Sequence, residues 1–308
     1  MRLFNRAVAS IMGFFPEPLI GPLVYRLVAK NYVAGPTIKD AVKRVKIINA
    51  RGADATIDHL GEEVKKEAEV AETIKIYSDL LKTIRRENLR ASISIKPTNF
   101  GLCLNRDLCF LSMREVVAAA AADNIFTWID MEDSSTTFAT VDFYLKAQRE
   151  FGDLVGVALQ AYLKNTAANA DLIMARARSV PHIRLCKGIY NESPRVAFKA
   201  MTFINFWYDT ILEKLLSKGS YVGIATHDPA RIDTALRLLQ RYKTPSEFQM
   251  LLGVENPALY DLINDGYRGT VYVPFGVRWY AYSMRRLKEN PRIVGYILKN
   301  MFSAGKQV

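Results

Sequence analysis

Short apolar runs alternate with longer amphipathic stretches along almost the whole chain after residue 50, and this alternation constrains the fold more than any other feature. The short runs are rich in β-branched residues, which is typical of strands, and the longer stretches have helical spacing. Alternating strands and helices favour a parallel sheet. Eight such units favour a closed (βα)8 barrel of the TIM type, an α/β fold, with extra N-terminal helices.

The predicted elements cover most of the chain. The predicted strands are Ala55–Leu60, Ala91–Lys96, Phe126–Met131, Val155–Leu163, His182–Lys187, Tyr221–Thr226, Phe248–Leu252 and Gly269–Val273. The predicted helices are Gly61–Glu87, Ser112–Asp123, Ser135–Phe151, Ala167–Ser179, Val196–Lys218, Pro229–Tyr242, Pro257–Asp265 and Arg278–Glu289. A doubly wound open sheet is the alternative, but the chain contains no G-x-G-x-x-G motif.

The first fifty residues lack the strand pattern. We predict that residues 1–50 form helices packed outside the barrel, and that residues 51–308 form the catalytic barrel with a C-terminal helix. The apolar stretch at residues 7–29 is interrupted by Pro16, Pro18 and Pro22. Its uninterrupted part is much shorter than the ~20 residues that span a bilayer, so it predicts an amphipathic helix.

The charge balance narrows the choice of partner. The chain of 308 residues has 42 Lys and Arg against 31 Asp and Glu, a net charge of +11. Such an excess suits nucleic acid, an anionic membrane surface or an anionic ligand. The basic residues are spread out and no basic run alternates with aromatic residues, so we expect no nucleic-acid partner. Three cysteines and three histidines, without a C-x-x-C motif, predict no structural zinc site.

Active sites of such barrels lie at the carboxyl ends of the strands, so polar residues at those positions are the candidate site residues. Lys96 closes the second predicted strand, where its ammonium group could bind a carboxylate or form a Schiff base. After the third strand come Asp130, Glu132 and Asp133. Strand alternation turns Asp130 inward. These carboxylates could pair with cations, bind Mg²⁺ or cap the next helix.

The fourth and fifth strands also end in polar residues. The amide of Gln160 could form hydrogen bonds with a polar heterocycle of a ligand, or with the protein backbone. Arg184 and Lys187 suit a phosphate or a carboxylate, and they could equally pair with the carboxylates after the third strand. Gly188 would let a ligand approach the backbone.

Thr226 and His227 end the sixth strand just before a helix N-terminus, which is a favourable place for an anion. His227 could also act as a general base, and Asp228 before Pro229 predicts a helix N-cap.

After the eighth strand, Tyr282, Arg285 and Arg286 share one helical face. Together with Lys96, the two guanidinium groups would clamp a carboxylate. The alternative is a basic, solvated helix end.

Six motifs, all at strand ends or after the eighth strand, resemble the proline dehydrogenase family in sequence and order. They are Ile95-Lys96, Asp130-Met131-Glu132-Asp133, Arg184–Tyr190, Ala225-Thr226-His227-Asp228, Glu247–Leu251 and Tyr282-x-x-Arg285-Arg286. The resemblance extends from about residue 50 to residue 290. It implies a distorted (βα)8 barrel that holds FAD without a covalent bond and oxidises L-proline to Δ1-pyrroline-5-carboxylate, the first step of proline degradation to glutamate.

The resemblance also implies residue roles. The catalytic positions are Lys96, Asp130, Tyr272, Arg285 and Arg286. The substrate-binding positions are Lys96, Leu251, Tyr272, Tyr282, Arg285 and Arg286, of which Lys96 and the two arginines hold the carboxylate. The flavin-binding positions are Gln160, Arg184, Lys187, Gly188, Thr226 and His227.

A quinone in the membrane is the implied electron acceptor, which gives the basic surface a use. We therefore expect a cytoplasmic protein, peripherally associated with the inner face of the cell membrane, with the tail Ile293–Leu298 as a membrane contact or a lid. Two other classes stay open. One is a Schiff-base barrel lyase that uses Lys96, with Asp130 or Glu132 as acid and base. The other is a non-enzymatic basic protein that binds membrane or RNA.

Overall fold

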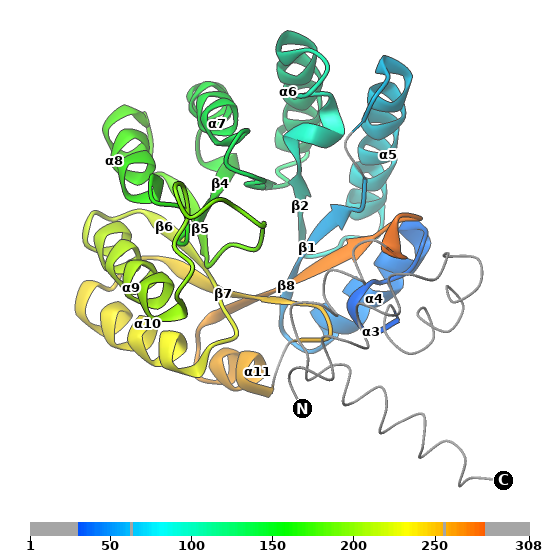
Figure 1. Ribbon diagram of the computed structural model, residues 1–308. Helices are drawn as coiled ribbons and strands as arrows, with labels where there is room; N and C mark the ends of the chain where they lie inside the picture. The colour runs from blue at the N-terminus through cyan, green and yellow to red at the C-terminus, as the bar shows by residue number, and fades with distance from the viewer. Residues whose placement is uncertain (1–29, 62–63, 255–256, 281–308) are drawn as a thin grey trace, which may run out of the picture.

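Parallel strands close into a barrel in the computed structural model, which describes residues 30–61, 64–254 and 257–280 (Figure 1). The strands follow one another around the barrel in chain order, and β8 pairs with β1. They are β1 (Asp54–His59), β2 (Ala91–Ile95), β3 (Thr127–Ile129), β4 (Val155–Gln160), β5 (His182–Cys186), β6 (Tyr221–Ala225), β7 (Ser246–Leu251) and β8 (Arg268–Phe275). The predicted (βα)8 barrel is confirmed.

Helices cover the outside of the barrel (Figure 1). They are α3 (Lys30–Tyr32), α4 (Ile38–Ala50), α5 (Glu67–Arg86), α6 (Arg106–Ala122), α7 (Thr137–Phe151), α8 (Thr166–Arg176), α9 (Met201–Ser217), α10 (Pro229–Tyr242) and α11 (Pro257–Asn264), with short 3-10 turns η2 (Pro97–Phe100) and η3 (Gly152–Leu154). The helix α4 packs against both β8 and β1, and so covers the seam where the barrel closes.

The division of the chain at residue 50 stays a prediction. The predicted helix at residues 7–29, the tail Ile293–Leu298 and all but the first residues of the predicted helix Arg278–Glu289 lie outside the described residues. Among the helices that are described, none combines the length and the apolar character needed to cross a bilayer.

Local hydrogen bonds explain where the helix boundaries differ from the prediction. The helix α6 begins at Arg106, earlier than predicted, because Oδ1 of Asn105 caps it by accepting from the backbone N–H groups of Asp107 and Leu108 at 2.8 and 3.1 Å. The helix α9 begins late, at Met201. The preceding residues instead pair with the loop after β4, where the N–H of Phe198 donates to the carbonyl of Tyr162 at 2.8 Å.

The two faces of the barrel wall differ in chemistry. Strand residues that face outward, such as Ile57, Ile95 and Val157, are fully buried beneath the helices. The inward positions hold many polar side chains, and the hydroxyls of Thr56 and Ser92 lie 2.8 Å apart there. Barrel interiors of this class are usually filled with bulky branched residues. The polar interior therefore marks the place where a site can form.

Small residues make room for large ones inside the barrel. A Cβ atom at Gly156 on β4 would lie 2.5 Å from the ring of Trp128 on β3, so only glycine lets this indole fit. Trp128 is almost fully buried, and its ring lies 4.7 Å from the guanidinium carbon of Arg184. The packing of β3 against β4 thus places an aromatic surface beside a buried cation.

Candidate active site

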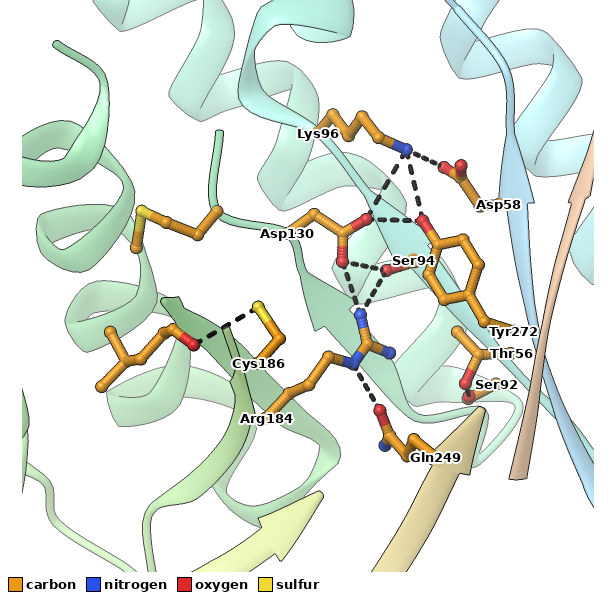
Figure 2. A network of polar contacts seen from close by, with 12 residues as sticks. Thr56, Asp58, Ser92, Ser94, Lys96, Asp130, Arg184, Cys186, Gln249 and Tyr272 are labelled. Carbon is orange, nitrogen blue, oxygen red and sulfur yellow. Dashed lines mark hydrogen bonds and ion pairs between the residues drawn. The ribbon is translucent and has the colours of Figure 1, made fainter. Parts of the chain in front are cut away.

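Charged side chains from the carboxyl half of the barrel meet in one network (Figure 2). We call Asp58, Lys96, Asp130, Arg184 and Tyr272 the charge network. The Nζ of Lys96, directly after β2, donates a hydrogen bond to Oδ1 of Asp58 on β1 and lies 3.5 Å from Oδ2 of Asp130. It also lies 3.3 Å from the hydroxyl oxygen of Tyr272. The network therefore links β1, β2, β3, β5 and β8.

Asp130 stands at the centre of this network. Its Oδ1 accepts hydrogen bonds from Oγ of Ser94 at 2.6 Å and from Nη1 of Arg184 at 2.5 Å. Its Oδ2 accepts from the hydroxyl of Tyr272 at 2.6 Å. Since β3 neighbours neither β5 nor β8, these bonds cross the barrel interior. The inward direction predicted for Asp130 and its ion pair with Arg184 are both confirmed.

The carboxylates keep Lys96 charged. Burial by itself lowers the pKa of Lys96, but the neighbouring Asp58 and Asp130 carboxylates outweigh burial and raise that pKa above its ordinary value. A Schiff base requires the neutral amine. The Schiff-base alternative for Lys96 would need a lowered pKa, and the nearest described charges act in the opposite direction because they are negative.

The two carboxylates of the charge network differ from each other. Burial raises the pKa of Asp58, against the opposing effect of Lys96. Burial also acts to raise the pKa of Asp130, but Arg184 and Lys96 together hold it below the ordinary value. When Asp58, Lys96, Asp130 and Arg184 are all ionised, their charges sum to zero. The described network has no spare positive charge for an anionic ligand.

A chain of hydrogen bonds from β7 and β8 holds the guanidinium group of Arg184. Its Nε donates to Oε1 of Gln249 at 2.6 Å, and Nε2 of Gln249 donates to Oε1 of Glu247 at 2.6 Å. The other carboxylate oxygen of Glu247 accepts from the hydroxyl of Thr270 at 2.5 Å. The Nη2 of Arg184 is buried and has no partner among the described residues. Arg184 is thus held in place with one donor left open.

We call Gln160, Lys187, Gly188, Thr226 and His227 the β4–β6 rim. The Nε2 of Gln160 donates to the backbone carbonyls of Met131 and Glu132 at 2.7 and 3.1 Å. Its Oε1 is buried without a partner in the described part of the chain. Because the amide nitrogen is fixed by backbone, the side chain presents an unsatisfied acceptor.

Lys187 and Thr226, two further members of the rim, both bind Asp228. The Nζ of Lys187 donates to Oδ2 of Asp228 at 2.6 Å, and the other oxygen of Asp228 caps α10 as predicted, accepting from the N–H of Ala230 at 3.1 Å. The hydroxyl oxygen of Thr226 accepts from the N–H of Asp228 at 3.1 Å. Of the two cations of β5, Lys187 therefore pairs with Asp228 after β6, and Arg184 reaches a carboxylate after β3.

Neighbouring residues contact both His227 and Gly188 closely. The Nε2 of His227 accepts a hydrogen bond of 2.9 Å from the N–H of Leu251, so this nitrogen is not available as a general base. Gly188 has a φ of +101°, and a Cβ atom there would lie 2.0 Å from the ring of Tyr162. The space beside Gly188 is thus filled by a tyrosine of the protein itself.

The carboxylates after β3 diverge rather than converge. Both oxygens of Glu132 accept from Thr98, from its N–H at 2.9 Å and its hydroxyl at 2.6 Å. Asp133 accepts from the N–H and the hydroxyl of Ser135 at 3.0 and 2.5 Å. In the described segments, no group of three or more His, Cys, Asp or Glu side chains is arranged to hold a metal ion. Glu132 and Asp133 are instead engaged by Thr98 and Ser135, and they do not join Asp130 in one cluster as the magnesium alternative would require.

Other predicted residues lie elsewhere, and some members of the site were missed. Tyr282, Arg285 and Arg286 lie outside the described residues, so the predicted clamp stays a prediction. Asp58, Ser94 and Gln249 belong to the site but were not singled out. Period-two alternation could have found Ser94 and Gln249, because they precede Lys96 and Leu251 by two residues and so share their faces.

The fold and the site define the class of protein. A (βα)8 barrel with a buried, charged cluster at the carboxyl end of its strands is an arrangement typical of an enzyme. Residues 41–297 match the sequence model of the proline dehydrogenase family. The chain belongs to that family.

Relatives of known name agree with this assignment. The chain is 35% identical over 280 residues to proline dehydrogenase 1 of Bacillus subtilis (strain 168), covering 90% of this chain and 91% of the relative. It is 31% identical over 281 residues to proline dehydrogenase of Deinococcus radiodurans, covering 89% of each. Both relatives are similar to this chain over nearly their whole length.

Solved structures share the fold. The crystal structure of proline utilization A from Bdellovibrio bacteriovorus, inactivated by N-propargylglycine, superposes with a TM-score of 0.80 at 20% identity. The match covers 91% of this chain and 34% of that protein, so the chain spans about a third of the longer protein. At this identity the likeness is evidence for the fold alone.

Proposed function

We propose that this enzyme oxidises L-proline to Δ1-pyrroline-5-carboxylate with FAD bound at the carboxyl end of the barrel, as the first step of proline degradation to glutamate. Membership of the proline dehydrogenase family supports the substrate and the reaction class. The observation that carries the site assignment is the charge network, which gathers Lys96, Asp130 and Arg184 where a barrel enzyme binds its substrate.

The described residues fit a flavin. A flavin ring carries both an N–H donor and carbonyl acceptors, and the barrel offers the buried Oε1 of Gln160 and the buried Nη2 of Arg184, both without partners among the described residues. We assign cofactor binding to Gln160, Arg184, Lys187, Gly188, Thr226 and His227. Bound FAD would supply the hydride acceptor, and the protein would supply position and electrostatics.

Recognition of the substrate carboxylate needs positive charge beyond the described network. That network is neutral when ionised, with Lys96 held between two carboxylates. We propose that Arg285 and Arg286 supply the missing charge and that Lys96 contributes a fixed ammonium donor. Asp130 positions Lys96, and Tyr272 donates to Asp130 because burial keeps the pKa of its hydroxyl above the ordinary value. Leu251, Tyr272 and Tyr282 would enclose the proline ring.

A membrane quinone is the proposed electron acceptor. The net charge of +11 favours contact with anionic lipids, and we propose a peripheral association with the inner face of the cell membrane from the cytoplasm. No nucleic-acid partner is proposed. The lyase alternative is disfavoured by the carboxylates that hold Lys96 protonated. A non-enzymatic role is disfavoured by membership of an enzyme family.

The test is an anaerobic absorbance spectrum of the purified protein before and after addition of L-proline. We expect flavin bands that bleach when L-proline is added. Flavin bands that do not bleach would reject the substrate while keeping the cofactor. A colourless protein that takes up no added FAD would contradict the whole proposal.

A further inference from the structure

Exposed apolar side chains collect at one end of the barrel. Among the large apolar residues that the structure describes as exposed, only Ile47 and Val180 lie toward the amino ends of the strands. The others follow a strand or lie in the first two turns of the next helix, as Phe138 does at the start of α7. This is the end at which the candidate active site lies. Large exposed apolar surfaces on a soluble domain usually mark a contact with a partner or a membrane.

The densest part of this surface lies at the start of α9, which packs between α8 and α10 on the outside of the barrel (Figure 1). We call Phe198, Met201, Phe203, Phe206 and Trp207 the α9 aromatic patch. Met201, Phe203 and Phe206 are 56%, 58% and 61% exposed. Phe198 stacks against both Phe203 and Trp207, with ring centroids 6.3 and 5.8 Å apart. Phe206 meets Trp207 edge-on at 5.7 Å.

The exposed members of the patch, Met201, Phe203 and Phe206, are not needed to hold α9 on the barrel, whereas Phe198 and Trp207 are partly buried against hydrophobic clusters. The other face of the helix, with Ile204, Tyr208 and Leu212, is buried and provides that packing. The helix thus has a buried face against the strands and a second, aromatic face directed away from them over its first two turns. The described structure places no covering element on that second face.

Positive charge surrounds the patch. The Nζ of Lys164 lies 5.8 Å from the ring centre of Phe198, and Arg195 and Lys199 are exposed on the loop that leads into α9. The first turn of α9 contains no acidic residue and no side-chain cap, so the positive end of the helix dipole is not offset locally. The nearby acid Glu192 is engaged by the N–H and hydroxyl of Ser134 at 2.6 and 2.8 Å.

We propose that the α9 aromatic patch and its cations Lys164, Arg195 and Lys199 bind the surface of an anionic lipid bilayer. Aromatic side chains favour the interface between lipid and water, and Lys and Arg beside them attract anionic headgroups. The patch follows β5, which also carries Arg184. Docking there would bring the candidate site close to a quinone in the bilayer. The inference rests on the membrane association of the proposed function and names the surface that makes it, whereas it does not depend on the substrate or the reaction.

The test measures cosedimentation of the full-length, flavin-loaded protein with vesicles of phosphatidylcholine containing phosphatidylglycerol. The affinity of the double variant Phe203→Ser/Phe206→Ser for these vesicles should fall by at least about tenfold. Ile47→Ser removes an equally exposed apolar side chain from the opposite end and should bind like the unchanged protein. Arg195→Glu, which leaves the aromatic side chains in place, should also weaken binding and should do so less at high salt.

Several outcomes would overturn this assignment. Unchanged binding by the double variant would do so, as would equal binding of the unchanged protein to vesicles without anionic lipid. Loss of FAD from the double variant would assign the patch to the cofactor. Loss of a dimer in sedimentation velocity would assign it to a second copy of the chain. Proline oxidation with a soluble dye is measured separately, so its failure would reject the proposed function without changing the vesicle result.

Discussion

The charge network and the β4–β6 rim lie at the same end of the barrel, yet their polar groups are satisfied in different ways. In the charge network, Asp130 binds Arg184 and Tyr272 from strands that are far apart in sequence and not adjacent in the barrel. In the rim, Lys187 binds Asp228 and Thr226 binds the backbone two residues on. The contacts of the charge network cross the barrel interior, whereas those of the rim join the ends of neighbouring strands, as Lys187 after β5 does with Asp228 after β6.

This difference agrees with the two roles proposed for these regions, substrate positioning and cofactor binding. A closed network of buried charges holds its geometry only when the whole barrel is formed, and it suits the positioning of a small polar substrate. A rim fixed by contacts between neighbouring strand ends can keep an unpaired hydrogen-bonding group, such as Oε1 of Gln160, without loss of order. Arg184 belongs to the charge network through Asp130, and its unpartnered Nη2 gives it the open hydrogen-bonding group that the rim also has in Gln160. Four changes would break or sharpen this comparison.

Arg184→Ala should have the largest effect, because Arg184 holds the charge network together and is also a proposed cofactor-binding residue. Breaking a buried ion pair leaves an uncompensated charge and costs about 3–5 kcal/mol of stability. We expect that loss in urea unfolding, together with loss of FAD from the purified protein. Arg114→Ala is the matched control, since Arg114 pairs with Glu150 on the surface. A stable, yellow Arg184→Ala protein would contradict both the stabilising role of Arg184 and its role in binding FAD.

Lys96→Met tests the charge network alone. It leaves Asp58 and Asp130 facing each other without their shared cation, and kcat/KM for L-proline should fall about a hundredfold while FAD stays bound. Lys96→Arg keeps the charge and should retain more activity than Lys96→Met. Equal loss in both variants, with trapping of the unchanged protein by borohydride, would instead favour Schiff-base chemistry.

Gln160→Leu tests the rim alone. It removes the open acceptor and should weaken FAD binding about tenfold, the value of one hydrogen bond to a buried group, with KM for L-proline unchanged in the FAD-saturated enzyme. Gln148→Leu is the control, because Gln148 is an equally buried amide that binds Ser179 away from the site. A changed KM with normal FAD affinity would move Gln160 to the substrate side.

A smaller effect concerns pH. Burial, assisted by Lys96, lowers the pKa of His59 from 6.5 to about 4. The unfolded chain therefore takes up the proton first as the pH falls, and the stability present above pH 6.5 is lost progressively down to about pH 4. Between pH 7 and 5.5 we expect a loss of about 1 kcal/mol in the free energy of unfolding. His59→Phe should remove that part of the slope, and an unchanged slope would contradict the assignment.

The sequence predicted much of the site, for reasons that individual residues make clear. Lys96 and Asp130 could be found because each directly follows an apolar strand, where the functional residues of a barrel enzyme lie. Asp58 was missed because nothing local shows that its partner is Lys96. Gln249 was missed because its neighbours in the motif are apolar and its role depends on Arg184, which is distant in sequence.

The sequence by itself determined the barrel and the end at which its site lies, because the alternation of strands and helices is a local, repeated signal and strand ends follow from it. Only the tertiary structure decided which charges meet. Closure of the barrel brings Arg184 on β5 to Asp130 after β3, and Lys96 between two carboxylates. The charge state of Lys96 depends on those neighbours, and they are set by the register of strands across the barrel rather than by the residues next to it in the chain.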